Sequence, residues 1–96
     1  MPLDQLISER RSEIVRIAKS HRAIRVAVLG SMAQGTAGAD SDVDLLVDLR
    51  EDASLLDIVA IKQDVEDLLG RRVDVLTPAS VSPYIRNEVL QQAVPL

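Results

Sequence analysis

The residues best suited to chemistry stand between Gly30 and Asp44, in the stretch GSMAQGTAGADSDVD. Gly30-Ser31 opens a short glycine-rich turn, and the backbone N–H groups of such a turn can hold phosphate oxygens. After ten further residues come Asp42 and Asp44, and on a strand two side chains at i and i+2 point to the same face. Two carboxylates on one face can share divalent cations. The stretch therefore predicts metal-assisted chemistry on phosphates, and we interpret it as a nucleotidyl-transfer site.

The same residues also admit a purely structural interpretation. In it, Gly30-Ser31 is only a turn, and Asp40, Asp42 and Asp44 are solvated loop acids. At average residue usage, a chance match to the four motif positions over this length is on the order of one in a thousand. We therefore favour the functional interpretation over the structural one.

A third acid lies on a later strand. The segment from Arg72 to Leu76 alternates Asp74 with Val73 and Val75, so Asp74 is expected to face away from the core. After Asp42 and Asp44, the sequence thus offers a third carboxylate that faces away from the core.

Strands and helices must hold these acids in place. Apolar runs predict strands at 24–29, 42–48 and 72–76, the first ending at Gly30. Amphipathic periodicity predicts a helix over residues 3–20. A second helix runs from a capping-box-like Ser54 to Gly70, and a last one begins at Ser82-Pro83. The apolar segment 93–96 is expected to dock on the domain or on a partner.

Composition limits the classes of protein that fit. With 96 residues, the chain is expected to form one domain over residues 1–96, with an aliphatic core because Tyr84 is its single aromatic residue. The net charge of −4 argues against a nucleic-acid-binding surface. The sequence has no cysteine, no export signal and no apolar run of membrane-spanning length, which favours a cytoplasmic protein with no membrane contact.

On these residues the chain resembles a minimal nucleotidyltransferase, the small branch of the DNA polymerase beta superfamily. The resemblance covers nearly the whole chain. Its marks are Gly30-Ser31, the ten-residue spacing, Asp42-Val43-Asp44, Val73-Asp74-Val75, Pro83-Tyr84-Ile85-Arg86 and Ala93-Val94-Pro95-Leu96. It implies an α+β, polymerase-beta-like nucleotidyltransferase fold, a small mixed sheet of three to four strands packed with about three to four helices.

The resemblance also implies a function and assigns roles to residues. Many members of this branch are antitoxins that transfer AMP from ATP to a tyrosine of a HEPN ribonuclease toxin. Carried over to this chain, Gly30 and Ser31 hold the triphosphate of ATP, and Asp42 and Asp44 bind two Mg²⁺ ions. Asp74 completes the metal site near the attacking hydroxyl. The implied partners are a HEPN-type toxin and ATP. Whether the chain also forms a homo-oligomer is left open.

The sequence departs from the family pattern at Met32 and Gln34, where members often carry arginines. Arginines there would meet phosphate oxygens with charge-assisted hydrogen bonds, and neither Met nor Gln carries that charge. These two positions therefore keep open an antitoxin that neutralises its toxin by binding alone. A nucleotidyltransferase for another acceptor is a separate alternative to the adenylyltransferase.

Overall fold

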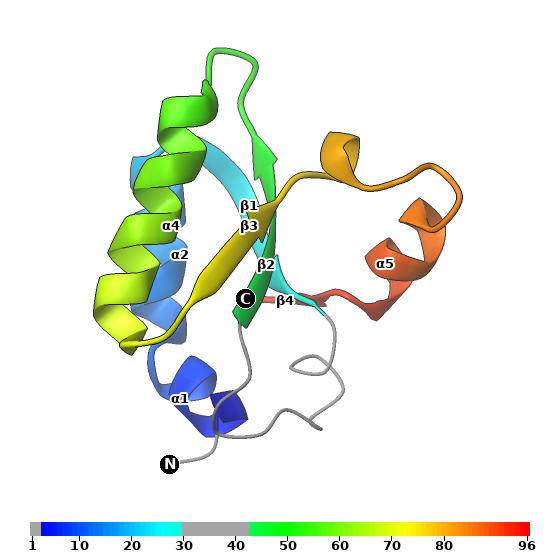
Figure 1. Ribbon diagram of the computed structural model, residues 1–96. Helices are drawn as coiled ribbons and strands as arrows, with labels where there is room; N and C mark the ends of the chain where they lie inside the picture. The colour runs from blue at the N-terminus through cyan, green and yellow to red at the C-terminus, as the bar shows by residue number, and fades with distance from the viewer. Residues whose placement is uncertain (1–2, 30–42) are drawn as a thin grey trace.

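The computed structural model describes residues 3–29 and 43–96 (Figure 1). In chain order these residues form α1 (Leu3–Glu9), α2 (Arg11–Ser20), β1 (Ala23–Val28), β2 (Val43–Leu49), α4 (Leu55–Leu69), β3 (Val73–Leu76), the 3₁₀ helix η1 (Pro78–Ser80), α5 (Arg86–Gln92) and β4 (Val94–Pro95). None of the helices described is long and apolar enough to cross a membrane.

The four strands form one mixed sheet in the order β3-β2-β1-β4. β1 pairs antiparallel with β2 and with β4, whereas β2 and β3 run parallel. Parallel neighbours need a crossover connection, and α4 supplies it between β2 and β3. The predicted α+β class, with a small mixed sheet and three to four helices, is confirmed.

The sheet is covered on both faces. α2 and α4 pack on one face and α5 on the other, as Figure 1 shows. The main core lies on the α2/α4 side, where Val43, Leu45 and Val47 of β2 are fully buried, as their alternation predicts. A smaller cluster on the α5 side contains Leu29, Leu46 and Val81. Apolar packing therefore also covers part of the face that carries the acids.

The helix predicted over residues 3–20 is divided into α1 and α2 at Arg10, so the single-helix prediction is wrong. The apolar stripe explains the break, because Arg10 and Arg11 fall where the pattern between Ile7 and Ile14 needs apolar residues. The Arg10 carbonyl still accepts the Ile14 N–H at 2.9 Å, so the two helices stay joined.

Both predicted ends of α4 are confirmed. Ser54 Oγ accepts the Leu56 N–H at 3.2 Å, and the Ser54 N–H donates to Asp57 Oδ2 at 2.9 Å, which completes a capping box. Gly70 ends the helix in the left-handed conformation, with φ 66°.

The C-terminal third departs further from the prediction. The last helix begins at Arg86 rather than at Ser82-Pro83, because the chain first makes a turn in which the Ser82 carbonyl accepts the Ile85 N–H at 3.1 Å. The apolar end docks on this chain's own sheet. There β4 pairs with Ala27 and Val28, and the Leu96 N–H donates to the Val26 carbonyl at 3.0 Å.

Candidate functional site

The predicted site begins where β1 and β2 meet at one end of the sheet. β1 leads into Leu29, whose N–H donates to the Asp44 carbonyl at 2.9 Å. Gly30, Ser31 and Asp42, together with Met32 and Gln34, belong to residues 30–42, which lie outside the described part of the chain. The chain therefore enters and leaves the predicted phosphate-binding segment beside Asp44.

Asp44 and Asp74 are brought together by the parallel pairing of β2 and β3. They are direct partners in its register, one step after the pair formed by Val43 and Val73. Both of those valines are fully buried in the main core, so the alternation of a strand turns the two aspartates to the opposite face. Neighbouring strands lie about 4.8 Å apart, so the two carboxylates project from adjacent positions.

A cavity of about 360 Å³ opens beside Asp44. Its other lining residues come from the ends of two strands and from the segment that includes η1 and α5. They are Leu29, Leu76, Ser80, Val81, Ser82, Ile85, Val89 and Gln92. An apolar hollow with a few polar groups and an acid at its margin is typical of a small-molecule site. The residues from α5 and the turn before it were missed by the sequence analysis, because only the fold brings them to the sheet.

A larger hollow of about 540 Å³ lies along β1 and includes Arg25 and Asp48. The Arg25 Nε lies 3.1 Å from Asp48 Oδ2, so the acid in this hollow already has a cationic partner. Neither Asp44 nor Asp74 lines the hollow. We therefore place the candidate site at the smaller cavity.

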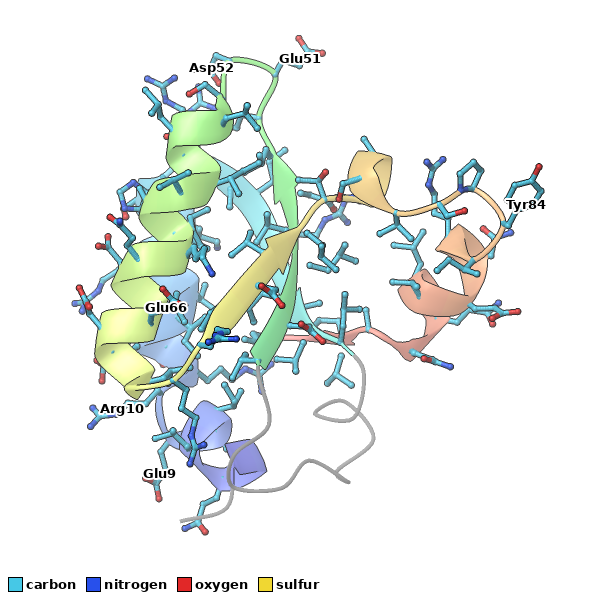
Figure 2. All side chains as sticks on the ribbon, viewed as in Figure 1. Glu9, Arg10, Glu51, Asp52, Glu66 and Tyr84 are labelled. Atoms are coloured by element: carbon cyan, nitrogen blue, oxygen red, sulfur yellow. The ribbon has the colours of Figure 1, made fainter. Side chains whose placement is uncertain are left out.

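Asp74 has a cation close by. Its side chain is 54% exposed, and its Oδ1 lies 4.0 Å from Lys62 Nζ of α4. Lys62 also reaches Glu66 Oε2 at 3.3 Å, and Figure 2 labels Glu66 on α4. Glu66 accepts the Val73 N–H, and mainly this hydrogen bond holds its pKa below the ordinary value, with the Lys62 charge acting in the same direction.

From the sequence alone, Lys62 and Glu66 are predicted to be surface residues of an amphipathic helix. Their i,i+4 spacing is typical of a solvated ion pair, so it gives no signal for contact with a strand. The structure instead packs both side chains, partly buried, against the first residue of β3.

Asp44 and Asp74, the candidate metal ligands that the structure describes, carry the oxygen ligands that a hard divalent cation prefers. Mg²⁺ is bound by one or two carboxylates together with water and phosphate oxygens, and Asp44 and Asp74 offer two carboxylates on one face. Within the described ranges, no group of three His, Cys, Asp or Glu side chains could hold a metal ion. The third predicted carboxylate, that of Asp42, is outside those ranges.

Fold and register together define a small α+β protein that carries paired acids on a mixed sheet. The family model described as "Nucleotidyltransferase domain" matches residues 11–96, so the chain belongs to the nucleotidyltransferase family. It is 39% identical over 88 residues to a Methanocaldococcus jannaschii protein named as a candidate protein adenylyltransferase, across 92% of this chain and 95% of that protein. It is also 42% identical over 69 residues to the protein adenylyltransferase MntA of Thermococcus cleftensis, covering 72% of this chain and 70% of MntA.

Solved structures agree with this assignment. A structure described as a candidate minimal nucleotidyltransferase has a TM-score of 0.90 and 41% identity, covering 100% of this chain and 97% of its own. A toxin–antitoxin complex solved with AMP-PNP has a TM-score of 0.74 and 21% identity, covering 88% of this chain and 69% of its own. This second likeness shows a shared fold. The chain is thus a minimal nucleotidyltransferase, as the sequence resemblance predicts.

Proposed function

We propose that this protein is an antitoxin-type adenylyltransferase, which transfers AMP from ATP to a tyrosine of a cognate HEPN-type ribonuclease toxin. The observation that carries the proposal is the in-register pair Asp44 and Asp74, of which Asp44 lines a cavity of about 360 Å³. Two further facts support it. Relatives 39% and 42% identical are named protein adenylyltransferases, or candidates for that activity, and the fold is shared with a toxin–antitoxin complex that holds AMP-PNP.

In the proposed reaction, the tyrosine oxygen attacks the α-phosphorus of ATP, the bond from that phosphorus to the bridging oxygen breaks, and pyrophosphate leaves. Gly30 and Ser31 hold the triphosphate. Asp42, Asp44 and Asp74 would hold two Mg²⁺ ions, which would supply charge neutralisation at the entering and leaving oxygens. Asp74, which would complete the metal site near the attacking hydroxyl, takes the hydroxyl proton as the new P–O bond forms.

The experiment mixes the purified protein with its proposed partner, a cognate HEPN-type toxin, and adds α-labelled ATP and Mg²⁺. We expect label on the HEPN-type protein, at tyrosine, and none when Mg²⁺ is chelated. Asp44→Asn and Asp74→Asn should each abolish the label, while the matched control Asp67→Asn, on the exposed side of α4, should not. Unchanged labelling by Asp44→Asn would contradict the proposal, as would a protein that binds ATP but labels no partner.

The second candidate is an antitoxin that acts by binding alone. Met32 and Gln34 favour it, because a turn without the family's usual arginines has less charge to hold a triphosphate. The double variant Asp44→Asn/Asp74→Asn separates the two candidates. Under the binding-only function it still forms the complex and still protects cells from the toxin, whereas under the enzymatic function protection is lost.

A further inference from the structure

Two side chains of α4, Lys62 and Glu66, close the outer edge of β3. The Arg72 carbonyl accepts the Val43 N–H at 3.0 Å, so the N–H and carbonyl of the next residue, Val73, point away from β2. Glu66 Oε2 accepts the Val73 N–H at 3.0 Å, and Lys62 Nζ donates to the Val73 carbonyl at 2.6 Å. Both polar groups at the start of this edge strand are therefore bound by one helix.

The same ammonium reaches the neighbouring aspartate. Lys62 Nζ lies 4.0 Å from Asp74 Oδ1 and 3.3 Å from Glu66 Oε2. Asp74 needs such a partner, because Asp44 faces it in register and like charges side by side on neighbouring strands repel each other. Since Lys62 is bonded to the backbone of β3, its charge is fixed relative to the strand that carries Asp74.

We infer that Lys62 and Glu66 are positioning residues for Asp74 in nucleotidyl transfer, an inference that rests on the proposed function. From the outer edge of β3, the charge of Lys62 orients and partly neutralises the carboxylate of Asp74, which eases its repulsion with Asp44 on the inner side. Glu66 holds Lys62 and the strand in place. Covering an exposed edge strand requires only that its outer N–H and carbonyl be bound. The second contact, to Asp74 Oδ1, distinguishes positioning from edge protection.

The experiment compares Lys62→Met, Lys62→Arg and Glu66→Ala with two controls. Lys19→Met changes the only other lysine of the sequence, which lies on α2, and Asp67→Ala removes an exposed acid next to Glu66. Three quantities are measured: amide hydrogen exchange of Val73 and Asp74 in the protein without ligands, the folded fraction by circular dichroism, and kcat and KM for AMP transfer. The acceptor is the cognate HEPN-type toxin of the proposed function, and each rate is divided by the folded fraction.

We expect Lys62→Met to lower kcat by about 10- to 100-fold, the usual cost of losing a residue that orients a metal ligand, with KM for ATP unchanged. Lys62→Arg should recover part of this loss because it keeps a cation and N–H donors. Glu66→Ala should lower kcat and remove the exchange protection of the Val73 amide. Both controls should behave as the parent protein.

If kcat per folded molecule in Lys62→Met and Glu66→Ala equals that of the controls, the two residues only cover the edge and the inference is overturned. Failure of the proposed function looks different, because the parent protein would then transfer no AMP to the toxin, or Asp44→Asn would transfer it at the parent's rate. A loss of activity in Asp74→Asn beside full activity in Lys62→Met contradicts only the positioning role.

Discussion

Asp44 and Asp74 are direct partners in the parallel register of β2 and β3, and both project from the face opposite the main core. Their register is set by buried neighbours. Val43 and Val73, one residue earlier on each strand, are fully buried and fix the register. A one-residue slip of β3 would turn every side chain of that strand to the other face. The core therefore determines that the two acids stand together.

The first prediction is that substituting Asp44 or Asp74 lowers activity strongly and leaves the free energy of unfolding nearly unchanged. Under the proposed function, Asp44→Asn or Asp74→Asn should reduce AMP transfer by more than about 100-fold, because losing a proposed metal ligand costs more than losing a residue that orients one. The free energy of unfolding should change by less than about 0.5 kcal/mol, since neither side chain belongs to the core. Labelling assays and urea denaturation measure the two effects. A large loss of stability would mean that the acids are structural.

Local chemistry made part of this fold predictable from sequence. The two-residue period of a strand gave the faces of β2 and β3, and hence the common side of Asp44 and Asp74. The ends of α4 were equally clear, because a capping box at Ser54 and a left-handed glycine at position 70 depend only on nearby residues.

The features that could not be predicted from the sequence depend on contacts between segments that are distant in the chain. β4 exists because residues 94–95 find an open edge on β1, and nothing in their own composition specifies a strand. In the sequence, Lys62 and Glu66 have the spacing of an ordinary helical ion pair, and only the packing of β3 against α4 places Val73 beside them. The cavity beside Asp44 likewise combines strand ends with η1 and α5, whose start was predicted too early. Such long-range pairings are not encoded in local spacing.

The second prediction concerns the core under α4. Ile61 is fully buried, and Ile61→Ala should lower the free energy of unfolding by about 2–5 kcal/mol through lost burial and a residual cavity. Leu56 on the same helix is 79% exposed, so Leu56→Ala is the matched control and should change stability by less than about 0.5 kcal/mol. Urea denaturation monitored by circular dichroism measures both. Equal effects would contradict the assignment of the buried face.

The third prediction tests the end of α4. Gly70 has φ 66°, and a Cβ added there would meet no atom within 4 Å. Gly70→Ala should therefore cost about 1 kcal/mol from backbone strain alone, and Gly70→Asn less, because asparagine tolerates the left-handed region better. Thermal unfolding of the two variants gives the comparison. An alanine variant as stable as the parent would show that the helix can end in another conformation.

The fourth prediction concerns the C-terminal strand. Removing residues 94–96 deletes the pairing with β1, the Leu96–Val26 hydrogen bond of 3.0 Å and the acceptors of Arg11 Nη2. Stability should fall by at least about 1 kcal/mol, the net contribution of a typical hydrogen bond. The uncovered edge of β1 should also promote self-association, visible by size-exclusion chromatography at rising concentration. Gln91→Ala, on the exposed surface of α5, is the control. A truncated protein that is as stable as this variant and associates no more than it does would contradict the role of β4.

The fifth prediction is a pH dependence of stability at Glu66. Its pKa lies below the ordinary value of 4.5 because the carboxylate accepts the Val73 N–H, helped by the charge of Lys62 and opposed by desolvation. A carboxyl group whose pKa is depressed by folding contributes stability that is full above its ordinary pKa and is lost as pH falls through the folded value. Glu66→Gln should therefore be less stable than the parent at about pH 7, and the difference should shrink toward about pH 3. Urea midpoints at each pH measure it, and a difference that stayed constant over this range would show that the hydrogen bond to Val73 does not depend on the charge of Glu66.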